Sequence, residues 1–375
     1  MSLNIHPKKT KIFVGHEQEK KIFQNAFFNN FLHHSWLLEG PAGIGKATFA
    51  YCAARSILAL NKENSNEVSL FSNLESDATN TLNFNFKENN LIHNRVSENT
   101  HVDLKIIERL DADKSPYSQD IIPVIKVRDI EIFFSKTSGE GGWRIAIIDS
   151  LDNLNKHGSN ALLKILEEPP KNCLIFLISS NKSNVLDTIR SRCRLLRFSP
   201  LKKNDTELII KNNIINESEE DLYKLSILSN GSPGKALMLY NNNGLELYDH
   251  LTNVFLNISN INSNDIDTLI SYISNKKNIF GIKIFNLLIT IFLNRTYRRA
   301  LNLITLDISI NEKHAQEYII NNFNIADLPT LWENIFTHIN KTSNFNLDKK
   351  QAIINMIESI KKLKKKKIYW IKFNE

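Results

Sequence analysis

The chain has 375 residues, of which 42% are hydrophobic and 23% are charged, with a formal net charge of +7. This composition is ordinary for a folded protein of two or three domains, and a disordered chain is not expected. The positive charge permits contact with nucleic acid, but lysine, asparagine and isoleucine are abundant along the whole sequence, so the charge alone identifies no partner.

The apolar runs and the cysteines limit where the protein can reside. The longest apolar runs, CLIFLISS and LLITIFL, are shorter than the ~20 residues of a membrane-spanning helix, and the first residues lack the apolar core of a signal peptide. Cys52, Cys173 and Cys193 are too widely spaced for a zinc module and too few for a disulfide framework. We therefore predict a cytoplasmic protein that contacts no membrane and binds no metal.

Five short apolar runs within residues 1–200 indicate buried strands. Each run is continuous and is bounded by Gly, Pro, Asp or Ser, as is typical of strands covered on both faces of a parallel sheet, and helical patterns separate the runs. The polar stretch at residues 61–100 is rich in Asn and Ser, which favours an insertion or long loop. The five runs are WLLEG (36–40), DLKIIER (103–109), WRIAIIDS (143–150), NCLIFLISS (172–180) and RLLRFSP (194–200).

Beyond residue 200 the pattern becomes helical. Residues 201–244 predict three short helices, among which Gly231, Ser232 and Pro233 supply a helix stop, an N-cap and a first-turn proline in succession. Residues 245–375 predict a further helical domain. The expected fold class is therefore α/β followed by all-α, in three domains.

The stretch GPAGIGKAT, residues 40–48, has the glycine spacing of a phosphate-binding loop. A predicted strand precedes it and a helical pattern follows, which is the setting that such a loop requires. Gly40, Gly43 and Gly45 would let backbone N–H groups turn toward an anion, and Lys46 would reach the terminal phosphates. The alternative is a chance glycine-rich turn.

Two positions argue against hydrolysis of ATP. The residue after the lysine supplies the Mg²⁺-binding hydroxyl of an active loop, and here it is Ala47, while Thr48 is expected to point elsewhere because it lies about 100° further round the helix. Asp149 ends an apolar strand and could face a metal through water. Its neighbour Ser150 stands where an ATPase carries the glutamate that polarises water, and Asp152 is expected to be a solvated turn or helix cap.

Charged residues mark two later segments. NALLKILEEPP, residues 160–170, predicts a helix with a broad buried face that ends before its prolines, with Glu167 and Glu168 as a charged helix end. TIRSRCRLLRF, residues 188–198, contains four arginines. These arginines could form a solvated edge or make nonspecific phosphate contacts. Alternatively, Arg192 projects into a neighbour's nucleotide site, where an arginine stabilises charge on the transferring phosphoryl group.

Together these segments resemble the delta prime subunits of bacterial DNA polymerase III, which belong to the clamp-loader AAA+ family. GPAGIGKAT, RIAIIDSLDNLN, NALLKILEEPP and TIRSRCRLL occur in the order and spacing of that family, and LLKILEEPP together with SRC is very specific to clamp-loader subunits. HVDLKIIER, EGGWRIAIID and GSPGKAL resemble the same subunits. The resemblance is strong over residues 11–200, moderate to about residue 241 and weak beyond.

The resemblance implies an AAA+ module with a five-stranded parallel sheet, a small three-helix lid and a helical collar. Through the collar, gamma/tau and delta subunits would join this chain in a hetero-pentameric ring, part of the DNA polymerase III holoenzyme. The sliding clamp and primer-template DNA would be reached through that complex. The resemblance also implies that Arg192 is an arginine finger, which acts in trans on ATP bound to an adjacent gamma/tau subunit.

Departures from the family pattern carry their own implications. Many relatives have four zinc-binding cysteines between the first two motifs, and this chain has none between Cys52 and Cys173, so no zinc is expected. Gly234 takes the place of the lid arginine that senses nucleotide, whereas Ser180 keeps the polar sensor position at a strand end. The loop would thus shape the domain and could hold ATP or phosphate, while no cofactor is required and hydrolysis belongs to the neighbours.

Two other functions stay open. An active gamma/tau-type ATPase or a related AAA+ DNA motor is disfavoured by Ala47, Ser150 and Gly234. A nucleic-acid-binding helical protein would use KKLKKKK at residues 361–367, a run that also fits a solvated helix end.

Overall fold

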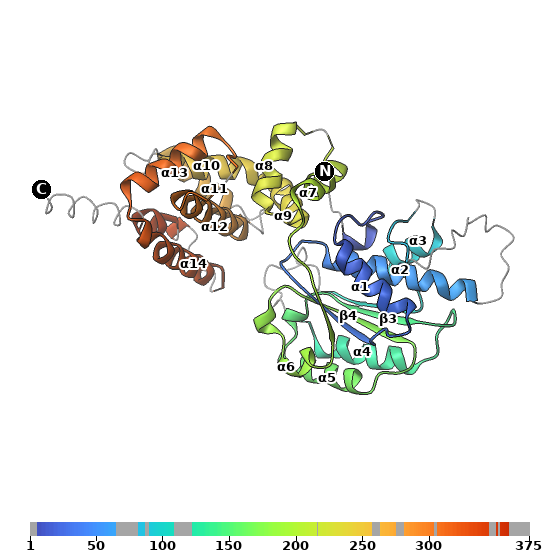
Figure 1. Cartoon of the computed structure of the whole chain (residues 1–375). Coiled ribbons are helices and arrows are strands. Elements are labelled where there is room, and N and C mark those ends of the chain that lie inside the picture. The colour runs from blue at the N-terminus through green and yellow to red at the C-terminus, as the bar shows by residue number, and fades with distance from the viewer. Residues whose placement is uncertain are drawn as a thin grey trace, which may run out of the picture. The chain divides into compact units, whose positions relative to one another are not determined.

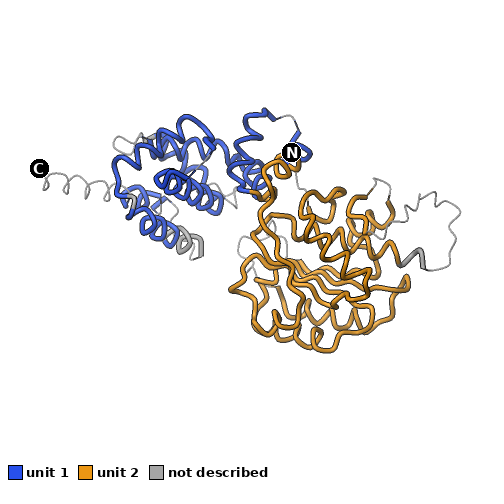
Figure 2. The backbone as a smooth tube through the Cα atoms, in the orientation of Figure 1, with its two compact units in different colours: residues 1–3, 210–230, 235–375 blue, residues 4–209, 231–234 orange. Residues whose placement is uncertain are grey.

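The computed structural model forms two compact units, which Figure 2 colours separately. One unit, here called the sheet unit, comprises residues 4–209 and 231–234, and the other, the helical unit, comprises residues 210–230 and 235–375. The residues that the structure describes are 6–64, 82–86, 90–108, 122–215, 217–256, 263–274, 281–303, 306–344, 350–351 and 353–359.

A parallel sheet of five strands forms the centre of the sheet unit, in the order β2-β3-β4-β1-β5. Every residue of β1, β3 and β4 is buried, which explains why their sequences are continuously apolar. Each of the five predicted runs forms one strand, so the predicted parallel sheet is confirmed. The strands are β1 (Ser35–Glu39), β2 (Leu104–Ile107), β3 (Arg144–Ile148), β4 (Cys173–Ser179) and β5 (Arg194–Arg197).

Helices cover both faces of this sheet (Figure 1). Successive strand residues point to opposite faces, so Trp36 packs in the apolar cluster with α1, α2 and α3, whereas Leu37 packs in the cluster with α4, α5 and α6. The helices are α1 (Glu17–Phe28), α2 (Lys46–Asn64), α3 (Leu91–Ser97), α4 (Val124–Ser135), α5 (Lys156–Glu167) and α6 (Asp187–Arg190), with short 3₁₀ turns at Pro7–Lys9, Leu151–Asn153 and Lys182–Asn184.

The prediction of a polar loop at residues 61–100 is wrong at both ends of this stretch, where the structure has helices. At the first end α2 continues to Asn64, and at the second the Asn90 side chain caps α3 by accepting from two backbone N–H groups. Phe84 and Phe86, which lie between these helices, are buried in the same cluster as Trp36. The middle of the stretch, residues 65–81 and 87–89, lies outside the described residues.

After the sheet the chain is helical, as predicted. The three helices expected at residues 201–244 are α7 (Lys203–Asn213), α8 (Glu219–Ser229) and α9 (Pro233–Asn241). One apolar core extends from Ile210 to Ile357, so α8 and α9 share their buried side chains with the later helices. The boundary between a lid and a collar near residue 244 stays a prediction. The later helices are α10 (Gly244–Leu256), α11 (Ser263–Ser274), α12 (Gly281–Ala300), α13 (Ile310–Asn322) and α14 (Leu328–Asn344), with a 3₁₀ turn at Ile325–Asp327.

Candidate functional site

The predicted phosphate loop joins the carboxyl end of β1 to the amino end of α2. Gly40, Gly43 and Gly45 have φ values of 153°, 76° and 111°, a region in which only glycine is unstrained. Space adds a second requirement at Gly40, because a Cβ there would lie 2.4 Å from the carbonyl oxygen of Phe198. Strand, loop and helix therefore follow in the predicted order, and the N-terminus of α2 brings its partial positive charge to the loop.

The Lys46 side chain is folded into its own loop. Its ammonium donates hydrogen bonds to the carbonyl oxygens of Gly40 and Pro41, each at 2.6 Å, and lies 3.4 Å from the hydroxyl oxygen of Ser180. The residue is only 4% exposed, and this burial lowers the pKa of Lys46 to about 8. A phosphate that entered the loop would have to replace the two carbonyls as partner of the ammonium.

A turn from a distant part of the sequence, residues 231–234, packs against the same loop. The Ser232 hydroxyl donates to the carbonyl oxygen of Ala42, and the Gly234 N–H donates to that of Gly43, both at 2.9 Å. A Cβ at Gly234 would lie 2.8 Å from the Cα atom of Gly43. A side chain at this position would therefore force the turn and the loop apart, which gives a packing reason for the glycine at this position.

The groups that would complete a hydrolytic site are missing. Ala47 presents only a methyl group in the first turn of α2, where it packs on the apolar cluster, and Thr48 follows it half-buried. Asp149 lies directly after β3, and burial, with the nearby Glu108 carboxylate, raises its pKa. Ser150 has a left-handed φ of 68°, and its neutral hydroxyl is a poor base for activating water.

Asp152 was expected to be a solvated turn or cap, and this expectation is wrong. Its carboxylate accepts hydrogen bonds from the Ser179 hydroxyl and the Ser180 N–H, each at 2.6 Å, and from the Asn181 N–H at 3.3 Å. Asp152 thereby fixes the carboxyl end of β4 beside the phosphate loop. The same contacts hold Ser180 near the ammonium of Lys46.

Arg192 lies at the opposite end of β1 from the phosphate loop. The hydroxyl of Ser35, the first residue of β1, donates to the carbonyl oxygen of Arg192 at 2.7 Å, whereas the loop follows Glu39, the last residue. Four residue steps along a strand span about 13 Å. The Arg192 guanidinium donates to the carbonyl oxygen of Thr188 at 3.0 Å and forms an ion pair with Glu167 at 2.7 Å. Because α5 ends at Glu167 before the amino end of β4, this guanidinium belongs to the amino end of the sheet.

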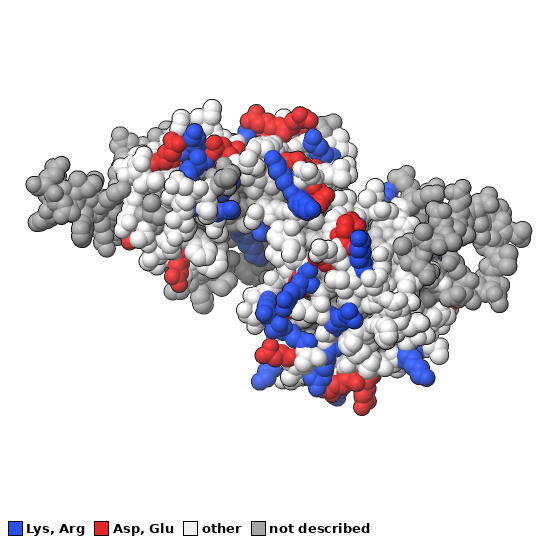
Figure 3. Space-filling view, in the orientation of Figure 1, with Lys and Arg blue, Asp and Glu red and all other residues white. Residues whose placement is uncertain are grey.

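The neighbouring arginines have different partners. The Nε atom of Arg190 lies 3.4 Å from a carboxylate oxygen of Glu39, which is only 7% exposed. The guanidinium of Arg194 lies over the ring of Trp36, 5.2 Å from its centroid. Figure 3 shows Lys and Arg over α5 and α6 with Asp and Glu among them. The segment is therefore not a uniform basic edge.

Reasoning from the sequence missed the partners of Arg192. The only signal that Glu167 gives in the sequence is a charge opposite to that of Arg192, and a charged helix end explains that charge equally well. Ser35 gives no signal of its contact with Arg192, because nothing in the sequence around a serine at the start of a strand indicates which group it will contact. Their roles become visible only once α5, β1 and the turn before β5 are placed side by side.

Absence of membrane and metal sites was also expected. Among the described helices, none combines the length and apolar character that a membrane crossing needs. Nor does the described part of the chain contain a group of three or more His, Cys, Asp and Glu residues placed to hold a metal ion. The absence of zinc and of any required cofactor stays a prediction.

Known proteins are similar to this chain over its sheet unit and part of the helices. The family model described as DNA polymerase III, delta subunit matches residues 15–202, half of the chain. The gamma subunit of Buchnera aphidicola subsp. Schizaphis graminum is 28% identical over 278 residues, covering 73% of this chain and 66% of the relative. The delta' subunit of Pseudomonas aeruginosa is 31% identical over 208 residues, covering 55% and 56%, and that of Bacillus subtilis is 29% identical over 184 residues, covering 48% and 47%.

The chain therefore belongs to the DNA polymerase III, delta subunit family of clamp-loader proteins. This confirms the resemblance seen in the sequence at the level of the family. The parallel sheet with its phosphate loop, followed by helices, confirms the expected fold class of an α/β domain with a helical part after it. The chain spans about half to two thirds of the length of these relatives, and the choice between a delta prime and a gamma/tau role remains open at this point.

Proposed function

We propose that this chain is a non-catalytic stator, of the delta prime kind, in a bacterial DNA polymerase III clamp loader. In the cytoplasm it would join gamma/tau and delta subunits in a hetero-pentameric ring and assist ATP-dependent loading of the sliding clamp on primed DNA. Arg192 would act in trans at the ATP site of a neighbouring gamma/tau subunit. The observation that carries this proposal is the phosphate loop, which keeps its shape but lacks the groups that hydrolysis needs.

The contacts of the loop support a structural role for it. Lys46 bonds carbonyl oxygens of its own loop, and the 231–234 turn bonds two more. Ala47 offers no oxygen to a magnesium ion, and Ser150 offers no carboxylate to a water molecule. The loop therefore ties the sheet to the 231–234 turn, and any anion held there would meet no hydrolytic groups.

The place of Arg192 supports action on another subunit. It lies about 13 Å along β1 from the chain's own loop, and its side chain is 36% exposed. An arginine that served its own loop would be needed at the carboxyl end of the strands. An arginine at the amino end of the strands, such as Arg192, is available to a ligand outside this chain.

An active ATPase of the gamma/tau type is the alternative function. The observation in its favour is that the match to the Buchnera gamma subunit covers 73% of this chain, more than the match to either delta' relative. Ala47, Ser150 and Gly234 oppose it, since each would have to be dispensable. Hydrolysis by the purified chain distinguishes the two functions.

We expect the purified chain to hydrolyse no ATP above background. The Ala47→Thr variant should be equally inactive, because it restores a metal ligand but leaves Ser150 without basicity. Phosphate release is the measurement, with a gamma/tau subunit from the same source as the positive control. Turnover by the wild-type chain that disappears on Lys46→Ala would contradict the non-catalytic role and favour the alternative.

A further inference from the structure

We propose that Glu167 is a positioning residue for Arg192. In the free subunit the Glu167 carboxylate binds the Arg192 guanidinium, and this ion pair must break before Arg192 can contact a neighbour's ATP. The inference rests on the proposed trans role of Arg192, and it adds a residue that sets how readily this role is performed.

The contacts of the guanidinium show why release is needed. Nη2 of Arg192 lies 2.7 Å from Oε1 of Glu167, and Nη1 donates to the carbonyl oxygen of Thr188 at 3.0 Å. Both terminal nitrogens are thus engaged within the chain. An arginine grips a phosphate with two N–H groups of its planar fork, and a carboxylate held against the same fork would repel the phosphate oxygens. The carboxylate and the phosphate therefore compete for the guanidinium.

The backbones that carry the two side chains are both fixed to the start of β1. Ser35, which is 0% exposed, donates to the carbonyl oxygen of Arg192 at 2.7 Å. The ring of His34, one residue earlier, is hydrogen-bonded through Nε2 to the carbonyl oxygen of Leu166 at 3.0 Å, directly before Glu167. Because both anchors hold main chain, the exchange from carboxylate to phosphate requires only side-chain rotation.

The surroundings allow this rotation. Glu167 lines a surface hollow of about 300 Å³ together with Glu131, Lys164 and Glu168. The hollow offers space to a released carboxylate, and Lys164 offers a cation nearby. The side chains of Arg192 and Glu167 are 36% and 49% exposed, so water screens their ion pair and the pair is weak. Glu167 consequently adjusts the availability of Arg192 and does not block it.

The test replaces Glu167 by Gln in a complex reconstituted with gamma/tau and delta subunits. We expect DNA-stimulated ATP hydrolysis and clamp loading to become roughly two- to fivefold faster, the range that a weak exposed ion pair permits. Glu167→Asp should behave like Glu167→Gln, because its charge remains but its shorter side chain loses the direct contact. Glu168→Gln is the matched control and should leave both rates unchanged.

The Arg192→Ala background separates this inference from the proposed function. There, Glu167→Gln should change neither rate, since the pair no longer exists. Two results would contradict the inference. One is that Glu167→Gln leaves the wild-type rates unchanged or lowers them, and the other is that it raises the rates equally in the Arg192→Ala background. If Arg192→Ala itself has no effect, the trans role fails instead. The melting temperatures of all variants serve to exclude unfolding as a cause.

Discussion

The Arg192→Ala variant is expected to fold and join the clamp-loader complex normally but to load clamps far more slowly. Its loss removes an exposed ion pair with Glu167, worth at most about 1 kcal/mol, and a hydrogen bond to the carbonyl oxygen of Thr188. At the neighbour's ATP site proposed for Arg192, an arginine supplied in trans would be worth ~10³ or more in rate. Total ATP turnover should fall less than clamp loading, because other sites in the ring would receive arginines from gamma/tau subunits. The measurements are DNA-stimulated phosphate release and clamp loading by the assembled complex.

Two substitutions show whether the fork of Arg192 or its charge is needed. Arg192→Lys should rescue little, since an ammonium is a point charge and cannot bind two phosphate oxygens with a planar fork. Arg194→Ala is the matched control, because this arginine is exposed and lies over Trp36. Arg190 is a poor control: its removal would leave the buried Glu39 carboxylate without its ion-pair partner. Equal losses from Arg192→Ala and Arg194→Ala would indicate a general basic patch, and a wild-type loading rate for Arg192→Ala would remove the proposed role.

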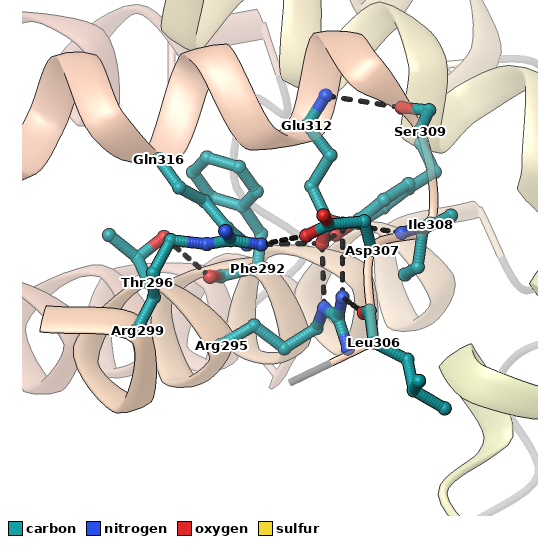
Figure 4. Close-up of polar contacts among 11 residues, drawn as sticks. Phe292, Arg295, Thr296, Arg299, Leu306, Asp307, Ile308, Ser309, Glu312 and Gln316 are labelled. Carbon is teal, nitrogen blue, oxygen red and sulfur yellow. Dashed lines mark hydrogen bonds and ion pairs between the residues drawn. The ribbon is translucent and has the colours of Figure 1, made fainter. Parts of the chain in front are cut away.

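A buried carboxylate, Glu312, organises the contact between α12 and α13 in the helical unit (Figure 4). It is 0% exposed. Its oxygens accept hydrogen bonds from Arg295 at 2.6 and 3.0 Å, from the Tyr248 hydroxyl at 2.7 Å, from the Ile308 N–H at 3.0 Å and from the Gln316 amide at 3.1 Å. The N–H of Glu312 also donates to Ser309, the N-cap of α13. Every contact of the carboxylate is with a donor, so it needs its negative charge and both oxygens.

The Glu312→Gln variant is therefore expected to destabilise the helical unit by about 3–5 kcal/mol. The amide has nearly the same shape, but its NH₂ group would face donors, and it would leave the Arg295 guanidinium, 12% exposed, without a counter-ion. Breaking a buried ion pair by removing one partner carries this cost. For a unit of this size the melting temperature should fall by roughly 10 °C, which scanning calorimetry would measure.

Glu317→Gln provides the matched control for Glu312→Gln, because Glu317 is an exposed glutamate on the same helix. It should change stability by no more than about 0.5 kcal/mol. The double variant Arg295→Met with Glu312→Leu should recover only part of the loss. It leaves no charge uncompensated, but it still deprives the Tyr248 hydroxyl, the Ile308 N–H and the Gln316 amide of their acceptor. Melting of Glu312→Gln at the temperature of Glu317→Gln would show that the network contributes little to stability.

The sequence by itself determined the sheet and the chemistry that is missing. Five continuous apolar runs predicted the five parallel strands, because strands covered on both faces must be apolar at every residue. The loop was predicted from glycine spacing between a strand and a helix. The absence of a hydroxyl at Ala47 and of a carboxylate at Ser150 needs no structure, since a side chain that lacks a group lacks it in any fold.

Only the tertiary structure decided what the remaining polar residues contact. Asp152 looked like a solvated cap and instead fixes the end of β4. The sequence suggested only that Gly234 replaces a sensing arginine, and the structure shows that it also packs closely against Gly43. The sequence suggested that Glu167 is a charged helix end, and the structure shows that it forms an ion pair with Arg192. A hydrogen bond or ion pair depends on two groups meeting within about 3 Å, and here the fold brings together segments far apart in the chain. Local patterns contain the chemistry of each side chain, but only packing of the sheet, its helices and the 231–234 turn assigns the partner.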